Sequence, residues 1–379
     1  MNIIIFVIIL MVLVIVHEAG HFFTAKSFKI RVDEFGFGFP PKIFGIKKGE
    51  TEYSINALPF GGFVKIFGED MDEADFLEVG FLDKKETPEK VALAERSLVS
   101  KPKYQQALVM FAGIFANFLL AWLFFSFGFM SGLPTSAGSQ PSGYQLVDTH
   151  LTIVSVLAKS PAAISGLKLG DKLISIKSGK DSVSDLNPVN LKSFIVSHPG
   201  KEIEISYLRG KDPNINSTKV TPVSSTTDGK PGIGIAMDEI GTLKLPFFTA
   251  LYAGVKFDWS VTKGTVVGLY NLISEGIRGK GSISSISGPV GMVGIVGDAY
   301  KFGFAYLLSF AALLSVNLAI INLIPFPALD GGRLLFLLIE RIKGSRINPK
   351  FAQKANMIGF AILIVLMVVV TLHDVVKLF

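Results

Sequence analysis

The chain has 379 residues, of which 49% are hydrophobic, and it carries a formal net charge of +6. Its mean hydropathy of +0.49 is too high for an ordinary water-soluble protein and indicates an integral membrane protein with a water-soluble part. The basic residues lie between apolar runs rather than in an aromatic-interleaved patch, so we attribute them to cytoplasmic loops and expect no nucleic-acid partner. The absence of cysteine excludes disulfides, thiolate metal sites and cysteine catalysis.

Four apolar segments are long enough to span a bilayer core, which takes about 20 helical residues. They are residues 3–25, 107–130, 304–325 and 357–372. The first segment has neither a basic n-region nor a small-residue cleavage site, so we do not interpret it as a cleaved signal. Lysines and arginines follow the first segment, precede the second, and fill the loop between the third and fourth, which predicts that these loops are cytoplasmic. Both chain termini and residues 133–302 are then expected outside.

Residues 31–68 are rich in glycine, phenylalanine and proline and contain short alternating runs, which is typical of strands and turns. So many phenylalanines in a cytoplasmic loop suggest that the segment dips into the bilayer, where protein or water must satisfy its backbone. A small solvated sheet with its own core is the alternative. Residues 69–103 carry charges of both signs and are predicted to form a solvated helical segment.

The segment expected outside contains a compact domain. Its pattern predicts a strand, a short helix after Pro161, a turn at Gly170-Asp171 and a further strand, and residues 201–210 alternate like a half-buried strand. Residues 246–277 mix apolar residues with lysine and aspartate, which favours helices lying on the membrane surface. A fifth span is the alternative interpretation of this last stretch.

The sequence His17-Glu18-Ala19-Gly20-His21 interrupts the first apolar segment. Residues i and i+4 of a helix share a face, so the two imidazoles can hold one metal ion, and neutral imidazole suits Zn²⁺. Glu18 would lie beside the metal, where a carboxylate can take a proton from bound water. A carboxylate inside the membrane costs roughly 2.5–3.5 kcal/mol, which argues against a chance match.

Catalytic zinc usually has three protein ligands, so a third must come from another segment. The candidate lies in NLIPFPALDGGR at residues 322–333, where two prolines break the helix and Asp330 stands in an apolar context. The alternative is that Asp330 only caps the helix that follows it. The other histidines are not expected to be the third ligand, because His373 lies near the outside end of the last span and His150 and His198 belong to the outside domain.

Together, HExxH in the first span and N-x-x-P-x-P-x-L-D-G in a later one resemble the motifs of the site-2 protease family. These proteins are intramembrane zinc metalloproteases, and the chain most resembles their bacterial RseP-type members over nearly its whole length. The second motif is matched position by position at Asn322, Pro325, Pro327, Leu329, Asp330 and Gly331.

The resemblance implies a role for each matching residue. It implies that His17, His21 and Asp330 bind Zn²⁺ and that Glu18 is the general base. The family's G-P-x-x-N motif appears at residues 113–117 without its proline. Substrate-binding positions are implied at Asn322, Pro325, Gly62, Phe63 and Asn117.

The resemblance also implies the domain organisation. Residues 31–68 resemble a membrane-reentrant β element, with GGFVKIFGE as its most recognisable part, and the outside domain resembles a single PDZ domain. The predicted fold is a multi-pass α-helical membrane protein with four transmembrane helices, a membrane-reentrant β element and an extracytoplasmic α+β PDZ domain. The predicted parts are residues 1–130 with the first two spans, 146–225 with the PDZ domain, 226–301 with surface-lying helices, and 302–379 with the last two spans.

The predicted function is that of an intramembrane zinc endopeptidase in the bacterial cytoplasmic (inner) membrane, with its active site towards the cytoplasm. The expected substrates are single-span membrane proteins, such as anti-sigma factors or signal-peptide remnants, and the PDZ domain is expected to exclude substrates with bulky outside domains. One alternative is a catalytically inactive, membrane-anchored PDZ scaffold. Another is a metal transporter, although transporters usually contain inverted repeats, which this sequence does not display.

Overall fold

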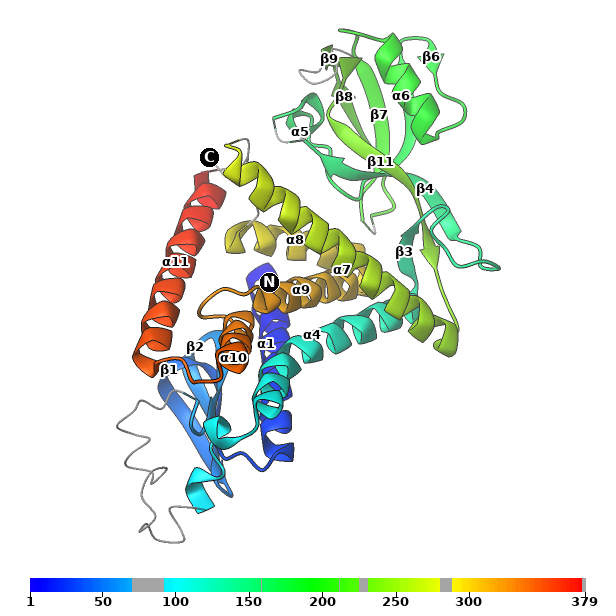
Figure 1. The fold of residues 1–379 in the computed structure, drawn as a ribbon. Coiled ribbons are helices and arrows are strands. Elements are labelled where there is room, and N and C mark those ends of the chain that lie inside the picture. The colour runs from blue at the N-terminus through cyan, green and yellow to red at the C-terminus, as the bar shows by residue number, and fades with distance from the viewer. Residues whose placement is uncertain (70–91, 158, 211, 225–230, 280–287, 377–379) are drawn as a thin grey trace. The chain divides into compact units, whose positions relative to one another are not determined.

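The computed structural model describes residues 1–69, 92–157, 159–210, 212–224, 231–279 and 288–376 (Figure 1). The chain divides into two compact units. The first comprises residues 1–124, 255–297 and 310–379, and the second comprises residues 125–254 and 298–309. The first unit is mainly helical and the second is mainly β.

Among the described residues, four helices are long and apolar enough to cross a membrane, namely α1 (Asn2–Ser27), α4 (Lys103–Ser131), α9 (Phe304–Leu323) and α11 (Pro349–Val376). The four predicted spans are therefore confirmed by length and composition. Helix α9 ends two residues before Pro325, because proline lacks a backbone donor and disfavours the helical conformation of the residue before it. Helix α10 (Asp330–Lys343) is followed by the cap residue Gly344, whose φ of 74° is the left-handed conformation common at helix C-termini.

The strands predicted within residues 31–68 are confirmed. They are β1 (Val32–Lys48) and β2 (Thr51–Ile66), which pair with each other. A cluster of buried side chains joins this sheet to α1 and α4 and gives it a shared apolar core. The buried members of this cluster are Phe22, Ala25, Ile30, Val32, Ile66, Leu98, Val109 and Met110. The depth of this element in a bilayer remains a prediction.

The pairing between β1 and β2 folds back on itself. Residues 34–37 pair with residues 52–55 on one side and with residues 62–65 on the other. The last of these segments therefore forms the outer edge of a small sheet, and no other strand in the described ranges pairs with its free side. An unpaired edge of this kind exposes backbone donors and acceptors to another peptide.

The segment predicted as a solvated helix, residues 69–103, lies largely outside the described residues. Its described part contains the short 3-10 helix η1 (Leu98–Ser100), and α4 begins at Lys103. The stretch predicted as surface-lying helices forms one continuous helix, α7 (Phe247–Ile277), which is not among the four apolar helices named above. Helix α8 (Pro289–Phe302) is capped by Asp374 of α11, whose Oδ2 accepts a hydrogen bond of 2.8 Å from the Gly291 amide.

The second unit is built around one sheet, in which neighbouring strands are antiparallel. Its strands lie in the order β3 (Leu133–Ser136), β11 (Ile235–Leu243), β4 (Val147–Val156), β5 (Lys172–Ser178), β7 (Ile203–Leu208) and β8 (Asn216–Val220), and the two-residue β6 (Asp181–Ser182) pairs with β5. Between β3 and β11 the chain also forms the helices α5 (Pro161–Ile164) and α6 (Pro188–Ser197) and a separate pair of short strands, β9 (Val223–Ser224) and β10 (Pro231–Gly232).

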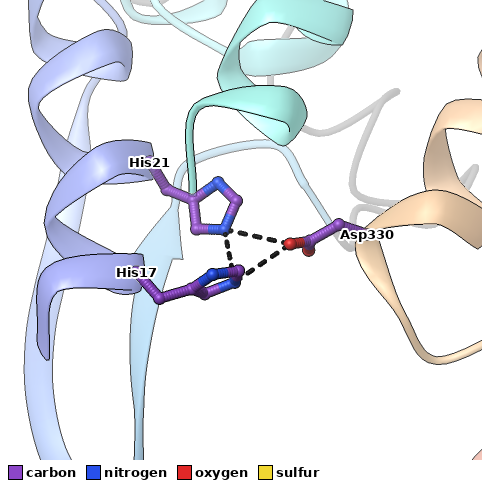
Figure 2. A group of neighbouring side chains, drawn as sticks. All are labelled: His17, His21 and Asp330. Carbon is purple, nitrogen blue, oxygen red and sulfur yellow. Dashed lines mark hydrogen bonds and ion pairs between the residues drawn. The ribbon is translucent and has the colours of Figure 1, made fainter. Parts of the chain in front are cut away.

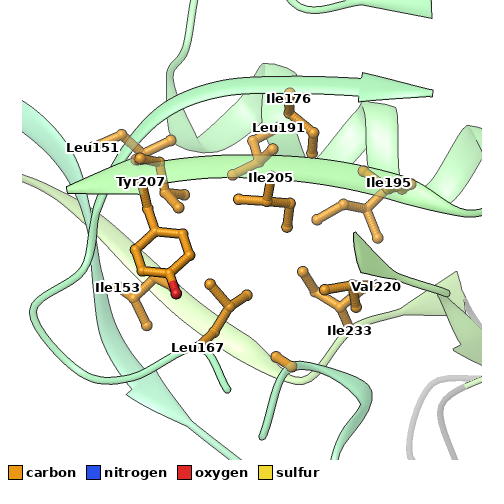
Figure 3. Packing of buried hydrophobic residues seen from close by; sticks show 13 residues of the cluster. Leu151, Ile153, Leu167, Ile176, Leu191, Ile195, Ile205, Tyr207, Val220 and Ile233 are labelled. Carbon is orange, nitrogen blue, oxygen red and sulfur yellow. The ribbon is translucent and has the colours of Figure 1, made fainter. Parts of the chain in front are cut away.

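The core of this domain lies between the sheet and α6 (Figure 3). Strand β7 shows the alternation that the sequence predicted, since Ile203 and Ile205 are buried and Glu204 is exposed. Leu191 and Ile195 of α6 pack in the same cluster.

The predicted turn at Gly170-Asp171 is fixed by an ion pair between a buried carboxylate and a partly exposed arginine. The Arg209 guanidinium donates Nε to Oδ1 and Nη2 to Oδ2 of the fully buried Asp171, each at 2.7 Å. A bidentate pair of this kind adds geometric specificity as well as energy. It holds the loop between α5 and β5 against the end of β7.

The sheet extends beyond the predicted domain limits of 146–225. Strand β3 precedes that range, and β11 lies inside the stretch 226–301 that was predicted to be helical. Both differences have one cause, because β11 returns to pair with β4 on one side and β3 on the other. A strand that is defined by such distant partners carries little local signal of its own.

Candidate active site

Helix α1 carries both histidines of the HExxH motif on one face (Figure 2). His17 and His21 are both buried, and their Nε2 atoms lie 3.2 Å apart. The spacing of four residues therefore has the consequence expected from helix geometry.

Asp330, the first residue of α10, supplies a third group to this cluster. Its Oδ2 lies 3.0 Å from His17 Nε2 and 3.3 Å from His21 Nε2. One ligand atom from each residue lies within 4.8 Å of the other two. The segment before α10 therefore brings together the three residues that were predicted as metal ligands.

The turn that aims Asp330 depends on the two glycines after it. A Cβ added at Gly331 would lie 2.2 Å from the carbonyl oxygen of Ile324, and one added at Gly332 would lie 2.2 Å from that of Phe326. Contacts this short do not occur for real side chains, so only glycine permits the chain to fold back this closely. The two glycines of the LDGG sequence are thus required for steric reasons, because they allow the turn that positions the Asp330 carboxylate.

The donor set fits zinc. Two imidazoles and one carboxylate are a known ligand set of catalytic zinc sites. The Asp330 Oδ2 is buried and accepts no well-directed hydrogen bond from the described residues, although both imidazole nitrogens are near. A buried carboxylate oxygen that faces two imidazole nitrogens is well suited to a shared cation.

Helix α4 supports the histidines from behind. His21 Nδ1 lies 2.8 Å from the carbonyl oxygen of Val109, so this nitrogen donates and Nε2 keeps its lone pair for a metal. Asn117 is fully buried, and its side chain lies 3.1 Å from His17 Nδ1. Both rings thus present Nδ1 to α4 and Nε2 to Asp330.

The two helices approach closely because glycines face the contact. A Cβ at Gly20 would lie 2.3 Å from the carbonyl oxygen of Ala112, and a Cβ at Gly113 would lie 2.3 Å from His21 Nε2. We therefore expect Gly113→Ala to displace the His21 ring or to push α1 away from α4. A displacement of about 1 Å can cost 100-fold in rate, so cleavage and zinc affinity should both fall at least about tenfold.

The matched control for this substitution is Gly264→Ala in α7, because nothing lies within 4 Å of a Cβ added there. That exchange should leave zinc content and cleavage unchanged, since alanine is favoured over glycine in a helix. Zinc affinity can be measured by chelator competition on the two purified variants. Equal affinities would contradict the assigned steric role of Gly113.

A cavity of about 770 Å³ opens beside the cluster. The predicted residues that line it are His17, Glu18, His21, Asp330, Gly62 and Phe63. Asn322, Pro325 and Asn117 are not among the described residues that line it. The predicted ligands, the predicted base and the β2 edge therefore line one cavity. Asn117 instead contacts His17 at Nδ1, the ring nitrogen on the side away from Asp330.

Two further residues of this cavity were not predicted to have a role. Arg333 of α10 and Glu69, which follows β2, form an ion pair and both line the cavity. Arg333 stands one helical turn after Asp330, and Glu69 ends the quoted GGFVKIFGE sequence. The sequence indicates a role for these two residues only through their positions beside the two motifs.

The model of "Peptidase family M50" matches residues 5–366. Zinc metalloprotease RasP of Geobacillus kaustophilus is 31% identical over 100% of this chain and 98% of its own length. Regulator of sigma-W protease RasP of Bacillus subtilis is 32% identical over 100% of this chain and 99% of its own. A solved PDZ domain of an SdrC-like protein from Listeria monocytogenes covers 24% of this chain and 92% of its own, at 22% identity and a TM-score of 0.21. The family match and the two relatives show that the chain belongs to peptidase family M50, the site-2 protease family, and is a membrane-embedded zinc metalloprotease.

Proposed function

We propose that this zinc metalloprotease cleaves membrane-spanning segments of other proteins, with zinc bound by His17, His21 and Asp330. The observation that carries the proposal is the convergence of three ligand atoms from α1 and α10 beside Glu18, in a helix apolar enough to span a bilayer. Ionisable groups in such a helix are costly and mark functional sites. When bound, zinc polarises the scissile carbonyl and makes its water more acidic.

Glu18 is the general base in this proposal. It lines the cavity beside His17 but contributes no ligand atom to the cluster. Its carboxylate accepts a proton from the attacking water as the new carbon–oxygen bond forms. The same carboxyl then returns a proton to the leaving amine as the peptide carbon–nitrogen bond breaks.

The free edge of β2 is proposed to hold the substrate. A Cβ added at Gly62 would lie 3.5 Å from Cγ of Glu18, so this edge passes close to the proposed base. A substrate span arrives as a helix with its carbonyl groups hydrogen-bonded and must unwind before attack. The unwound segment can pair with the edge by β-addition at Gly62 and Phe63, and Asn322 and Pro325 remain proposed substrate contacts after α9.

We expect the chain to lie in the bacterial cytoplasmic membrane, with both termini outside and the active site towards the cytoplasm. One relative is named as a regulator of sigma-W, which favours anti-sigma factors among the single-span substrates that we propose. For the β-rich second unit we propose a PDZ domain that acts as a size filter. It would exclude substrates that still carry bulky outside domains.

Removal of the filter should widen the range of substrates. Deleting residues 147–234 and joining the ends by a Gly-Ser linker removes the elements from β4 to β10, and it keeps β3 and β11, which pair directly. The deletion variant should cleave single-span reporters with and without a folded outside domain, whereas the full chain should cleave only the trimmed reporter.

Reporter cleavage in membranes, followed by gel electrophoresis, distinguishes these cases. The deletion variant that also carries Glu18→Gln is the control for other proteases. Loss of cleavage of the trimmed reporter, in a variant that still binds zinc, would contradict the filter and indicate that the domain is needed for catalysis.

The test of the proposed function as a whole is zinc content and cleavage of a single-span reporter by the purified protein, for wild type and Glu18→Gln. About one zinc per chain and cleavage within the span by wild type alone are expected. A folded protein with neither property would favour the catalytically inactive PDZ scaffold instead.

A further inference from the structure

The side chain of Asn117 occupies a position that substrate binding does not explain. It belongs to α4, is 0% exposed, and meets Nδ1 of His17 at 3.1 Å. The opposite nitrogen of that ring, Nε2, faces Asp330 and His21. Asn117 therefore contacts the proposed zinc ligand from the side away from the metal.

The orientation of the amide determines which ring nitrogen carries the proton. If Asn117 Nδ2 donates to His17 Nδ1, a neutral imidazole must carry its proton on Nε2, which then cannot bind zinc. In that orientation Asn117 Oδ1 is also buried without a hydrogen-bond partner among the described residues. A half turn of the amide brings Oδ1 to the ring, where it accepts the Nδ1 proton and leaves the Nε2 lone pair for the metal. One rotation therefore gives the buried oxygen a partner and leaves Nε2 of His17 free to bind the metal, while Nδ2 moves to the place that Oδ1 held.

One neighbouring contact fixes the position of Asn117, and a second parallels the contact that this orientation makes. Ser315 of α9, itself fully buried, donates its hydroxyl to the backbone oxygen of Asn117 at 2.7 Å, which fixes α4 at this residue. His21 makes the equivalent contact through Nδ1 to the carbonyl oxygen of Val109. In the second orientation of the Asn117 amide, helix α4 offers an oxygen to each histidine, one from its backbone and one from a side chain.

We propose that Asn117 is a positioning residue whose Oδ1 accepts the Nδ1 proton of His17 and thereby makes Nε2 the zinc ligand. This role replaces the substrate contact that the sequence suggested, since the amide is buried and does not line the cavity. The proposal rests on the proposed zinc site. Helix α4 supplies none of the three ligands. Under this proposal it nevertheless raises the affinity for zinc, through Asn117.

The test compares two variants of the full chain in detergent. Asn117→Leu has a similar size but no acceptor, and Asn117→Asp keeps an acceptor oxygen. Zinc affinity, measured by chelator competition, should fall about 10- to 100-fold in Asn117→Leu, as it does on loss of other residues that support zinc ligands. It should stay within about threefold of wild type in Asn117→Asp, because carboxylates also support zinc-bound histidines.

A purely structural role would give a different result. It would lower affinity in both variants alike, and it would lower the thermal stability of the zinc-free protein. Unchanged affinity in Asn117→Leu, or equal losses in both variants, overturns the proposal and leaves the proposed function intact. Absence of zinc from wild type would overturn the proposed function itself.

A measurement on the wild type decides the question if Asn117→Leu does not fold. Nitrogen-15 NMR of zinc-free, histidine-labelled protein distinguishes a protonated Nδ1 from a protonated Nε2, and zinc is left out because zinc bound at Nε2 would by itself leave the proton on Nδ1. A proton on Nδ1 of His17, assigned by comparison with His17→Ala, supports the proposal. A proton on Nε2 overturns it.

Discussion

Replacing Glu18 by glutamine is expected to abolish peptide cleavage while zinc stays bound. Glutamine has nearly the same shape, but its amide cannot accept a proton from water at neutral pH. General acid–base groups contribute about 100- to 10,000-fold to rate, so initial cleavage rates of a single-span reporter should fall at least 100-fold. Zinc should remain at the wild-type level, because Glu18 is not one of the three clustered ligand residues.

The measurement pairs reporter cleavage with metal analysis of the same purified sample. Wild type carried through the same detergent and buffer is the reference for both. A variant that retains more than a tenth of the wild-type rate would assign the base to another residue. A variant that loses its zinc would instead make Glu18 part of metal binding.

Replacing Asp330 by alanine is expected to remove zinc from the protein. The carboxylate is one of three ligands, and its loss leaves two imidazoles from a single helix. We expect zinc affinity to fall by more than the roughly 100-fold that loss of a supporting residue can cause, with no detectable cleavage. Dialysis against a chelator, followed by metal analysis, measures the difference.

The alternative that Asp330 only stabilises the start of α10, where Leu329 holds the cap position and Asp330 is the first helical residue, predicts a different outcome. Loss of a stabilising group at a helix N-terminus costs about 1 kcal/mol of stability and would leave zinc bound. Leu338→Ala, on the same helix at a residue that is 54% exposed, is the control and should keep wild-type zinc. Zinc retention in Asp330→Ala would therefore assign the residue only to the start of α10.

The predicted metal ligands could be found from sequence because their signals are local. The two histidines need only helical periodicity, and Asp330 is marked by a carboxylate between two apolar segments. The four spans follow from length and hydropathy in the same way. Each of these inferences depends on residues that are neighbours along the chain.

The features that the sequence did not predict depend on distant partners. Strand β11 is defined by pairing with β3 and β4. An exposed strand edge was expected within residues 31–68, but its location at residues 62–65 was not, because it depends on β1 also pairing with an earlier part of β2. Asn117 was recognised as a site residue, but only the packing of α4 against α1 shows which side of His17 it contacts. The pairing of Arg333 with Glu69 likewise joins two segments far apart in sequence.

The unpaired edge of β2 has a consequence for selectivity. Backbone donors and acceptors are the same in almost every peptide, so a substrate that pairs with this edge is held without regard to most of its side chains. Discrimination among substrate spans must then come from the step before pairing, in which the membrane helix of the substrate unwinds. Glycine and proline lower the cost of opening a helix, whereas leucine and alanine raise it. The protease would thus select spans by their helical stability rather than by a recognition sequence.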